Sequence, residues 1–342
     1  MGLPKDCKIK LENKYPKGQK NLITDIKGVK VGHYTLEDDE RHIHTGVTAI
    51  LPHDRNLFQE KVMAGVSVIN GFGKSVGLVQ IEELGTIESP ILMTNTFAVG
   101  TALNASVKYM LQKNQDIGIK TGTVNCVVTE CNDGELNDIR GLYIQENHVF
   151  SALENTSETF EEGSVGAGTG MCCMGLKGGI GSASRVVTCD GVSYTIGAIL
   201  MSNFGVAGNL RIDGKKIRPQ DTVADTSEKG SVIIVIATDL PLNERQLKRV
   251  AKRSTVSLSR VGSYLGNGSG DIAIAFSTGN ILPHYSEKNI LHTKMFHDHS
   301  MDRIFEATAE AVEEAIVSSL YYGDTKSGVK GKVIHSLQDI ME

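Results

Sequence analysis

The chain has 342 residues, of which 40% are hydrophobic, so it can form one large domain or two small domains around a sizeable core. Its formal net charge of −5 argues against nucleic acid or an anionic membrane as a partner, because both attract a basic face. No apolar run reaches the roughly 18 residues that a membrane span needs, and the start lacks the apolar core of a signal peptide.

Cysteine usage and the first residues bear on compartment and modification. With no export signal, we expect reduced structural thiols and a cytoplasmic protein. The pair Met1-Gly2 begins a lipidation motif, but position 6 holds Asp6 rather than serine or threonine, so acylation is not expected. None of the cysteines forms a Cys-x-x-Cys pair; they are Cys7, Cys126, Cys131, Cys172, Cys173 and Cys189.

Strand and helix patterns follow one another in mixed order along the chain. Residues 1–20 are polar and lysine-rich, which predicts a flexible N-terminal arm. Strand patterns lie at 22–54 (around a polar loop, 36–44), 62–70, 90–95, 125–129, 192–202 and 231–238, and helical patterns at 98–112, 145–160, 243–259 and 302–320. Because no repeat or long linker divides this alternation, residues 21–342 predict one α/β domain whose helices cover buried sheets.

Glycine is most frequent at residues 163–181. A phosphate-binding loop is one interpretation of such a run. However, the segment lacks the Gly-Lys-Ser/Thr ending of a P-loop and the spacing of a dinucleotide fingerprint. We therefore expect close packing of the backbone around a pocket.

The helix predicted over 302–320 has one apolar and one acidic face. We expect the acidic face to be solvated, and Ser300 or Asp302 to cap the start of the helix. The acidic face consists of Glu306, Glu310, Glu313 and Glu314.

A glycine-rich corner feeds a short apolar strand at residues 266–278. Large residues alternate there with small ones, which is a strand period, at Ile272, Ile274 and Phe276. Ser269 stands at the start of this strand between two glycines, which leaves its hydroxyl sterically open.

One chemistry suits this corner well. The Ser269 hydroxyl can attack the carbonyl of Gly268, and water can cleave the resulting ester. Ser269 would then be a new N-terminus, whose α-amine has a reference pKa of about 7.7–8.0 and can act as a base near neutral pH. The alternative is a plain turn, because Asn267-Gly268 is a strong hairpin signal.

Several blocks, in order from about residue 20 to residue 325, carry a family resemblance. They are Ile23–His33, Thr45–Pro52, Val68–Lys74, Glu82–Thr86, Gly166–Gly170, Lys177–Gly181, Asn203–Gly205 and Gly266–Asp271. Together they resemble the P1 family of self-processing aminopeptidases, peptidase family S58. This family includes the L-aminopeptidase/D-amidase-esterases and the β-peptidyl aminopeptidases.

The resemblance implies a fold, a reaction and an assembly. The fold would be an αββα sandwich of two packed mixed sheets covered by helices, like that of N-terminal-nucleophile hydrolases. The chain would cleave itself between Gly268 and Ser269, and Ser269 would then form an acyl-enzyme with substrates. These would be small peptides, amino-acid amides or esters, cut next to a free amino group. No cofactor or metal is implied, and a homo-oligomer, suspected to be a tetramer, is expected.

The resemblance also assigns roles at two strand ends. Asn203 matches an oxyanion-hole position, although asparagine is also a common turn former. Glu130 is expected to hold the substrate's ammonium group; the alternative is a surface turn, because Asn132-Asp133-Gly134 follows. Some relatives carry a tyrosine where this chain has Asn132, which is expected to line the substrate site but cannot supply a phenolic proton.

Other reactive groups have weaker patterns. Cys131, Cys172 and Cys173 could be nucleophiles, but no histidine follows at a telling spacing. Glu313 is a second possible anchor for a substrate amine. A histidine-rich group does not match a zinc signature and is expected to be a solvated loop: His292, His297, Asp298 and His299.

Two other functions remain open from the sequence. An amine could intercept the acyl-enzyme in place of water, which would make the protein an aminoacyl transferase. An uncleaved chain without turnover would instead indicate a binding or structural subunit. The pattern leaves open whether L-, D- or β-amino acids are preferred.

Overall fold

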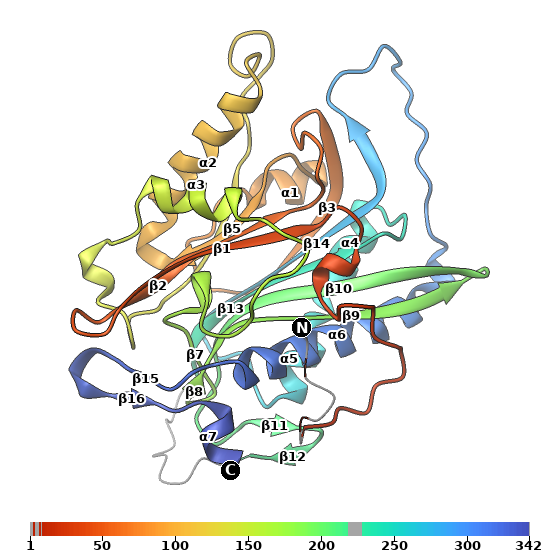
Figure 1. Cartoon of the computed structure of the whole chain (residues 1–342). Helices are drawn as coiled ribbons and strands as arrows, with labels where there is room; N and C mark the ends of the chain where they lie inside the picture. Colours follow the sequence, from red (N-terminus) through yellow and green to blue (C-terminus); the bar gives the residue numbers. More distant parts are fainter. Residues whose placement is uncertain (1–2, 4–6, 8, 218–227, 342) are drawn as a thin grey trace.

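A computed structural model describes residues 3, 7, 9–217 and 228–341 of the chain. Two mixed sheets lie face to face (Figure 1). The larger has six strands in the order β4 (Thr86–Ile87), β3 (Glu60–Gly71), β14 (Gly268–Pro283), β13 (Lys229–Thr238), β10 (Val192–Asn203) and β9 (Gly179–Cys189). The smaller has four, in the order β1 (Lys30–Asp38), β2 (Ile43–Leu51), β5 (Ile91–Asn95) and β6 (Val127–Cys131). The pairs β13–β14 and β5–β6 are parallel, and the other pairs within these sheets are antiparallel.

Helices cover the outer face of each sheet. The smaller sheet packs against α2 (Val99–Lys113) and α3 (Glu146–Glu154). The larger packs against α4 (Glu244–Lys252), α5 (Ser254–Arg260) and α6 (Met301–Tyr321). The short helix α1 (Leu78–Leu84) packs beside β3 and β4, and the short helix α7 (Leu337–Met341) packs beside α6. The layers follow the order helix, sheet, sheet, helix, which confirms the predicted αββα sandwich.

The alternation of large and small residues along β14 explains how this strand packs between its neighbouring layers. Ile272, Ile274 and Phe276 belong to the apolar cluster between the two sheets. Ala273 and Ala275 belong to the cluster beneath the outer helices. Because helices approach one face and a second sheet the other, both faces of β14 are buried, and small residues suit the helix side.

Several predicted boundaries were wrong for local reasons. The helix expected at 145–160 ends at Glu154, because Ser157 instead pairs with Val31 through two backbone hydrogen bonds of 2.9 Å. The helix expected at 243–259 is two helices, since the N–H of Arg253 bonds to the carbonyl of Val250 in a tighter turn. The loop between the first two strands shrinks to 39–42, because β1 and β2 stay paired as far as Asp38 and Ile43.

Close packing of the glycine-rich segment is confirmed. A Cβ atom on Gly168 would lie 2.5 Å from the backbone nitrogen of Ile180. A Cβ on Gly181 would lie 1.9 Å from the carbonyl oxygen of Ala315, so β9 can pack directly against α6 only because this position is glycine.

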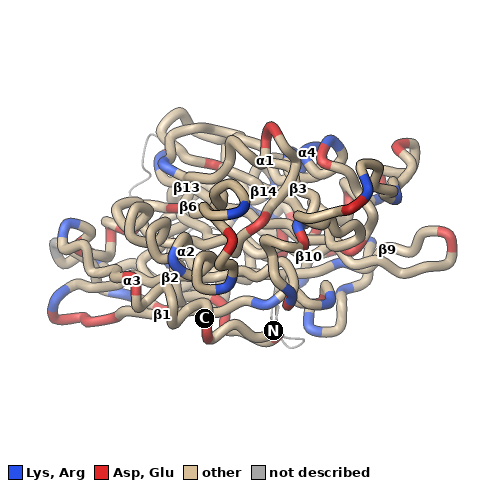
Figure 2. The backbone as a smooth tube through the Cα atoms, turned by 90° about the horizontal axis from the view of Figure 1, so that it is seen from above, with Lys and Arg blue, Asp and Glu red and all other residues tan. Residues whose placement is uncertain are grey.

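Acidic and basic residues are interspersed over the backbone, with the run of four acids at 37–40 as a local exception (Figure 2). In the described ranges, no helix combines the length and the apolar character needed to cross a bilayer.

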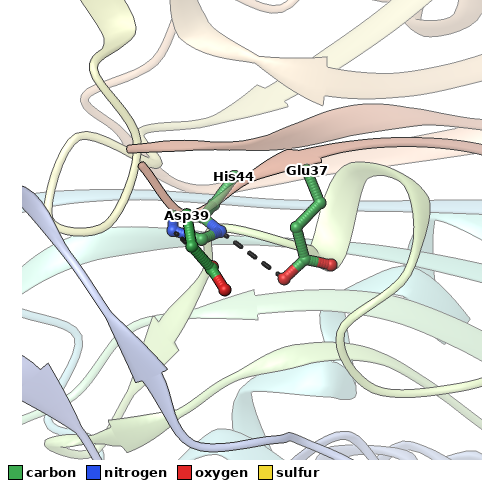
Figure 3. A group of neighbouring side chains, drawn as sticks. All are labelled: Glu37, Asp39 and His44. Atoms are coloured by element: carbon green, nitrogen blue, oxygen red, sulfur yellow. Dashed lines mark ion pairs between the residues drawn. The ribbon is translucent and has the colours of Figure 1, made fainter. Parts of the chain in front are cut away.

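An acidic group lies where β1 turns into β2 (Figure 3). Glu37 and Asp39 flank the buried imidazole of His44, whose Nδ1 lies 3.7 Å from Glu37 and whose Nε2 lies 3.7 Å from Asp39. The ammonium group of Lys326 already pairs with Glu37, and His44 Nε2 lies 3.1 Å from the carbonyl oxygen of Ser327. Lys326 thus already supplies a positive charge to one of the two carboxylates of this group.

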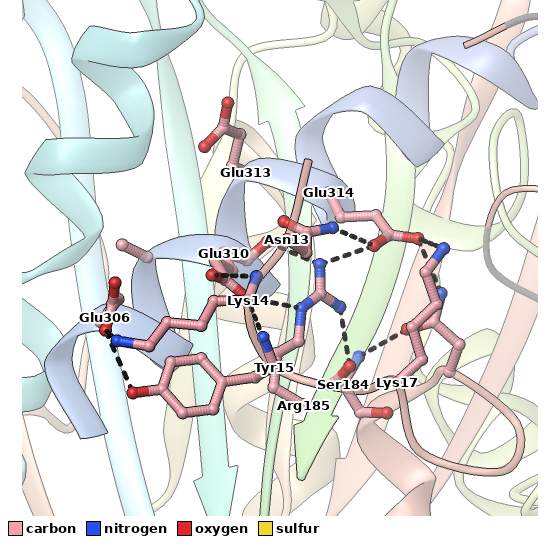
Figure 4. A network of polar contacts seen from close by, with 12 residues as sticks. Asn13, Lys14, Tyr15, Lys17, Ser184, Arg185, Glu306, Glu310, Glu313 and Glu314 are labelled. Carbon is pink, nitrogen blue, oxygen red and sulfur yellow. Dashed lines mark hydrogen bonds and ion pairs between the residues drawn. The ribbon is translucent and has the colours of Figure 1, made fainter. Parts of the chain in front are cut away.

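The acidic face of α6 is only partly solvated, so the prediction was wrong for two of its four acids (Figure 4). Glu310 and Glu314 are buried, because the fully buried guanidinium of Arg185 on β9 contacts both carboxylates at 3.2 and 2.7 Å. Segment 13–17 crosses the same face, where Lys17 pairs with Glu314 at 2.7 Å.

The other two acids of this face, Glu306 and Glu313, also have partners. Glu306 pairs with Lys14, and Glu313 pairs with Arg260 of α5 at 2.8 Å. Ser300 occupies the N-cap position but makes no side-chain capping bond. The face that looked solvated therefore serves as the docking surface for the described part of the N-terminal segment.

Candidate active site

Ser269 lies at the start of β14, in the middle of the larger sheet, and is fully buried. The predicted turn is present, because the N–H of Ser269 donates to the carbonyl of Gly266 at 3.0 Å. Because the turn ends at Ser269, the turn interpretation and the nucleophile interpretation of this segment are compatible with each other. The Ser269 hydroxyl donates to Oδ1 of Asp271 at 2.6 Å.

The carboxylate of Asp271 lies at the same corner as the Ser269 hydroxyl, and no role was predicted for it from the sequence. Asp271 is 1% exposed and pairs with Asn70 of β3 in the sheet. Burial raises the pKa of Asp271 to about 6, while the Ser269 hydroxyl favours the ionised form. The i, i+2 spacing from serine to aspartate was the available signal, because residues two apart on a strand share a face.

The side chain of Asn70 holds both sides of the corner. Its Nδ2 donates to the carbonyl of Gly266 at 2.7 Å and to the carbonyl of Ser269 at 2.6 Å. The N–H of Phe72 also bonds to the Ser269 carbonyl, at 3.3 Å. These contacts fix the backbone before and after the Gly268–Ser269 bond.

Asn203 ends β10, and sheet pairing aligns it with the corner through Ser231 of β13, which in turn pairs with Gly270. Its Oδ1 accepts the N–H of Cys172 at 2.9 Å, and its Nδ2 donates to the carbonyl of Asn132 at 3.0 Å. A carboxamide nitrogen carries two hydrogens, so one donor remains beyond this contact. The orientation of the amide is thus held by two backbone groups.

Glu130 lies within β6 rather than in a surface turn, and only 4% of it is exposed. Its Oε1 accepts the N–H of Lys74 at 2.8 Å, and Oε2 accepts the hydroxyl of Thr96. A Cβ placed on Gly73 would lie 3.3 Å from Glu130 Oε1 and 4.0 Å from the Cα of Gly270, so the carboxylate lies near the corner. In the part of the chain that the structure describes, Glu130 has no ion-pair partner within 4 Å.

The side chain of Asn132 is exposed and turns back to accept the N–H of Gly134 at 2.9 Å. Its backbone carbonyl, not its side chain, contacts Asn203. The residue therefore supports the candidate oxyanion donor through its main chain.

The competing nucleophiles lie in environments that disfavour thiolates. Burial raises the pKa of the Cys172 and Cys173 thiols to about 12, and that of Cys131 well above its ordinary value. In the histidine-rich group, Asp298 is bound by Arg245 and by Gln246 of α4, and the remaining members are exposed: His292, His297 and His299.

Comparisons with known proteins agree over almost the whole chain. Residues 21–334 match the model of peptidase family S58. The chain is 38% identical to β-peptidyl aminopeptidase BapA of Sphingosinicella microcystinivorans, over 94% of this chain and 86% of that protein. The crystal structure of the PH0078 protein from Pyrococcus horikoshii OT3 is similar, with a TM-score of 0.91, 48% identity and coverage of 98% and 96%.

A further similar structure is an L-aminopeptidase D-Ala-esterase/amidase from Ochrobactrum anthropi, with a TM-score of 0.89 and 36% identity. The match covers 97% of this chain and 95% of that one. That protein is described as a prototype for the serine aminopeptidases and as a variant of the N-terminal-nucleophile (Ntn) hydrolase fold.

Proposed function

The chain belongs to peptidase family S58, and on this premise we propose that it processes itself between Gly268 and Ser269 and then acts through Ser269. The family membership confirms the resemblance seen in the sequence, together with the expected hydrolase of peptide bonds and the Ntn-like fold. The observation that best supports the proposed site is the buried Ser269 hydroxyl, held at the end of a tight turn and 2.6 Å from a carboxylate.

Processing would divide the single domain of residues 21–342 without separating its layers. Cleavage leaves Ser269 at the start of β14, between β3 and β13, so the two fragments stay bound through the central sheet. The freed α-amine of Ser269 then lies beside the hydroxyl of the same residue, and it accepts the hydroxyl proton when the oxygen attacks a substrate.

Turnover would follow from the groups around this new N-terminus. Ser269 Oγ attacks the substrate carbonyl, and the Asn203 amide stabilises the negative charge that develops on oxygen. Collapse of this intermediate releases the leaving amine or alcohol, and water hydrolyses the acyl-enzyme. Glu130, buried without a cationic partner in the described ranges, binds the substrate's ammonium group.

The substrates we propose are small peptides, amino-acid amides and esters with a free amino group. The names of the relatives, β-peptidyl aminopeptidase and L-aminopeptidase D-Ala-esterase/amidase, support this class. We further propose a cytoplasmic homo-oligomer, a tetramer by family resemblance, that needs no cofactor or metal and acts on neither nucleic acid nor membrane.

A paired substrate panel tests this function. Purified wild-type protein and Ser269→Ala are given amino-acid amides, short peptides and esters, each with a free and an N-acetylated amino group. We expect the wild type to hydrolyse the free forms, the acetylated forms to react very slowly and Ser269→Ala to be inactive. Equal turnover by Ser269→Ala, or equal hydrolysis of both forms, would contradict the proposal.

A further inference from the structure

We propose that Asp271 is the base that starts self-processing, by accepting the proton of the Ser269 hydroxyl as this oxygen attacks the carbonyl carbon of Gly268. This inference rests on the proposed self-processing and adds the residue that performs its first proton transfer.

The uncut chain cannot use the base proposed for turnover. Before cleavage, the nitrogen of Ser269 belongs to a peptide bond, and its N–H is donated to Gly266. An amide nitrogen has no basic lone pair, because that pair is delocalised into the carbonyl. The first reaction of the protein therefore needs a base other than the α-amine that it creates.

The geometry points to Asp271. Its Oδ1 accepts the hydroxyl proton at 2.6 Å, which is within the 2.6–3.2 Å expected for a general base, and its side chain is buried. No cation lies within 4 Å of its carboxylate among the residues described. The carboxylate thus contacts the reacting oxygen without being neutralised by a lysine or arginine.

The other titratable groups around the corner are engaged elsewhere or exposed. The carboxylate of Glu228, which precedes β13, accepts the Ser263 hydroxyl and the N–H of Tyr264. Burial raises the pKa of the Cys131 thiol on β6 well above its ordinary value, and the charges of Glu130 and Asp271 raise it further, so the thiol stays protonated. Lys229, which pairs with Gly268 across the sheet, is exposed.

The proton that leaves the Ser269 hydroxyl returns to the Ser269 nitrogen through Asp271, so the step needs no other proton donor or acceptor. Asp271 takes the hydroxyl proton while a bond forms between Ser269 Oγ and the carbonyl carbon of Gly268. The bond from this carbon to the Ser269 nitrogen then breaks, and the nitrogen takes the proton back from the carboxylic acid. The products are an ester and a free α-amine; water then hydrolyses the ester to the Gly268 carboxylate and the serine hydroxyl.

The test follows the conversion of freshly synthesised full-length chain into fragments 1–268 and 269–342, by mass spectrometry after cell-free translation. Asp271→Asn keeps the shape of the side chain and its ability to accept a hydrogen bond, but removes the base. We expect its cleavage to be about 10²–10⁴-fold slower than that of the wild type.

Asp239→Asn is the matched control. Asp239 is a partly buried aspartate at the far end of β13, its pKa is also raised by burial, and it accepts the N–H of Thr195 at 2.7 Å rather than a reacting hydroxyl. We expect Asp239→Asn to cleave at the wild-type rate. Thermal melts of all variants, made with Ser269→Ala to prevent cleavage, check that each one folds.

A pH profile separates proton transfer from a structural role. With the pKa of Asp271 raised to about 6, the wild-type cleavage rate should rise tenfold per pH unit below 6 and level off above it. The residual rate of Asp271→Asn should lack this step. If Asp271 merely supports the turn, Asp271→Asn would keep the wild-type profile, and that result would overturn the inference.

Asp271→Ala provides a second test in case Asp271→Asn does not fold. Asp271→Ala leaves space for a small carboxylate, and added formate should restore part of its cleavage, whereas chloride at the same ionic strength should not. Wild-type-like cleavage in both Asp271 variants would refute the role of Asp271 alone. An uncut wild-type chain would refute self-processing itself, so the two failures are distinguishable.

Discussion

The amide of Asn203 donates to the backbone carbonyl of Asn132 at 3.0 Å, and this contact links the ends of β10 and β6 across the two sheets. The same carboxamide accepts the N–H of Cys172. An oxyanion donor is effective when its orientation is fixed before the reaction, because no reorganisation is then needed. Asn203 has that property, because backbone groups hold both ends of its carboxamide.

Asn203→Ala is therefore expected to lower kcat by about 10²–10³, the usual cost of one oxyanion donor. Steady-state kinetics with an amino-acid amide measures this effect, and a thermal melt checks the fold. Turnover within a few-fold of the wild type would remove Asn203 from the reaction. If the variant also stays uncut, the same pocket serves processing and turnover.

Glu130→Gln keeps the shape of the side chain but removes the charge. Its amide oxygen can still accept the N–H of Lys74, while its NH2 group donates to the Thr96 hydroxyl, which reverses that hydrogen bond. Binding of substrates with a free amino group should weaken by about 2–5 kcal/mol, because a buried charge pair is lost. Hydrolysis of N-blocked esters, already slow, should change little. KM and kcat for both classes give the measurement.

The blocked substrates act as the internal control for Glu130, since a folding defect would lower both classes together. A variant that still prefers the free amine would place the anchor elsewhere. Glu313, the other candidate, is an unsuitable replacement because its carboxylate is bound by Arg260 of α5.

Asn70→Ala should slow self-cleavage by up to about 10²-fold. The variant loses the donor that holds the carbonyls of Gly266 and Ser269, so the hydroxyl and the scissile carbonyl are less well aligned. Asn280→Ala is the control, because Asn280 also bridges two segments, through the backbone of Lys294, but at the far end of β14. Equal cleavage rates in the two variants would show that the Asn70 clamp does not matter.

Arg185→Met should lower the free energy of unfolding by about 3–5 kcal/mol, because Glu310 and Glu314 would be left as buried carboxylates without their cation. Denaturant unfolding of the uncut Ser269→Ala background measures the change. Lys14→Met, which removes the exposed ion pair with Glu306, should leave the midpoint almost unchanged. Similar midpoints for both variants would contradict the structural role of Arg185.

The parts of the fold that depend on local pattern were predictable from the sequence. Alternation at Ile272, Ile274 and Phe276 predicted a strand, and the apolar run before Asn203 predicted the strand that ends at it. The order of the layers came from family resemblance, because periodicity within one segment does not say which segments pair.

The parts that depend on contacts between distant segments were not predictable. The acids of α6 looked solvated, because nothing near them in the sequence indicates that Arg185, more than a hundred residues earlier, is buried beneath them. At the candidate site, Ser269 and Asn203 were predicted from motifs together with the family resemblance. The clamp by Asn70 was missed because it depends on the pairing of β3 with β14.

Intact mass spectrometry of the purified protein is the most direct test of self-processing at Ser269. We expect the wild type to separate, under denaturing conditions, into the two chains 1–268 and 269–342, and Ser269→Ala to remain one chain. An uncut wild type, or a Ser269→Ala chain cut at the same bond, would contradict self-processing by the Ser269 hydroxyl.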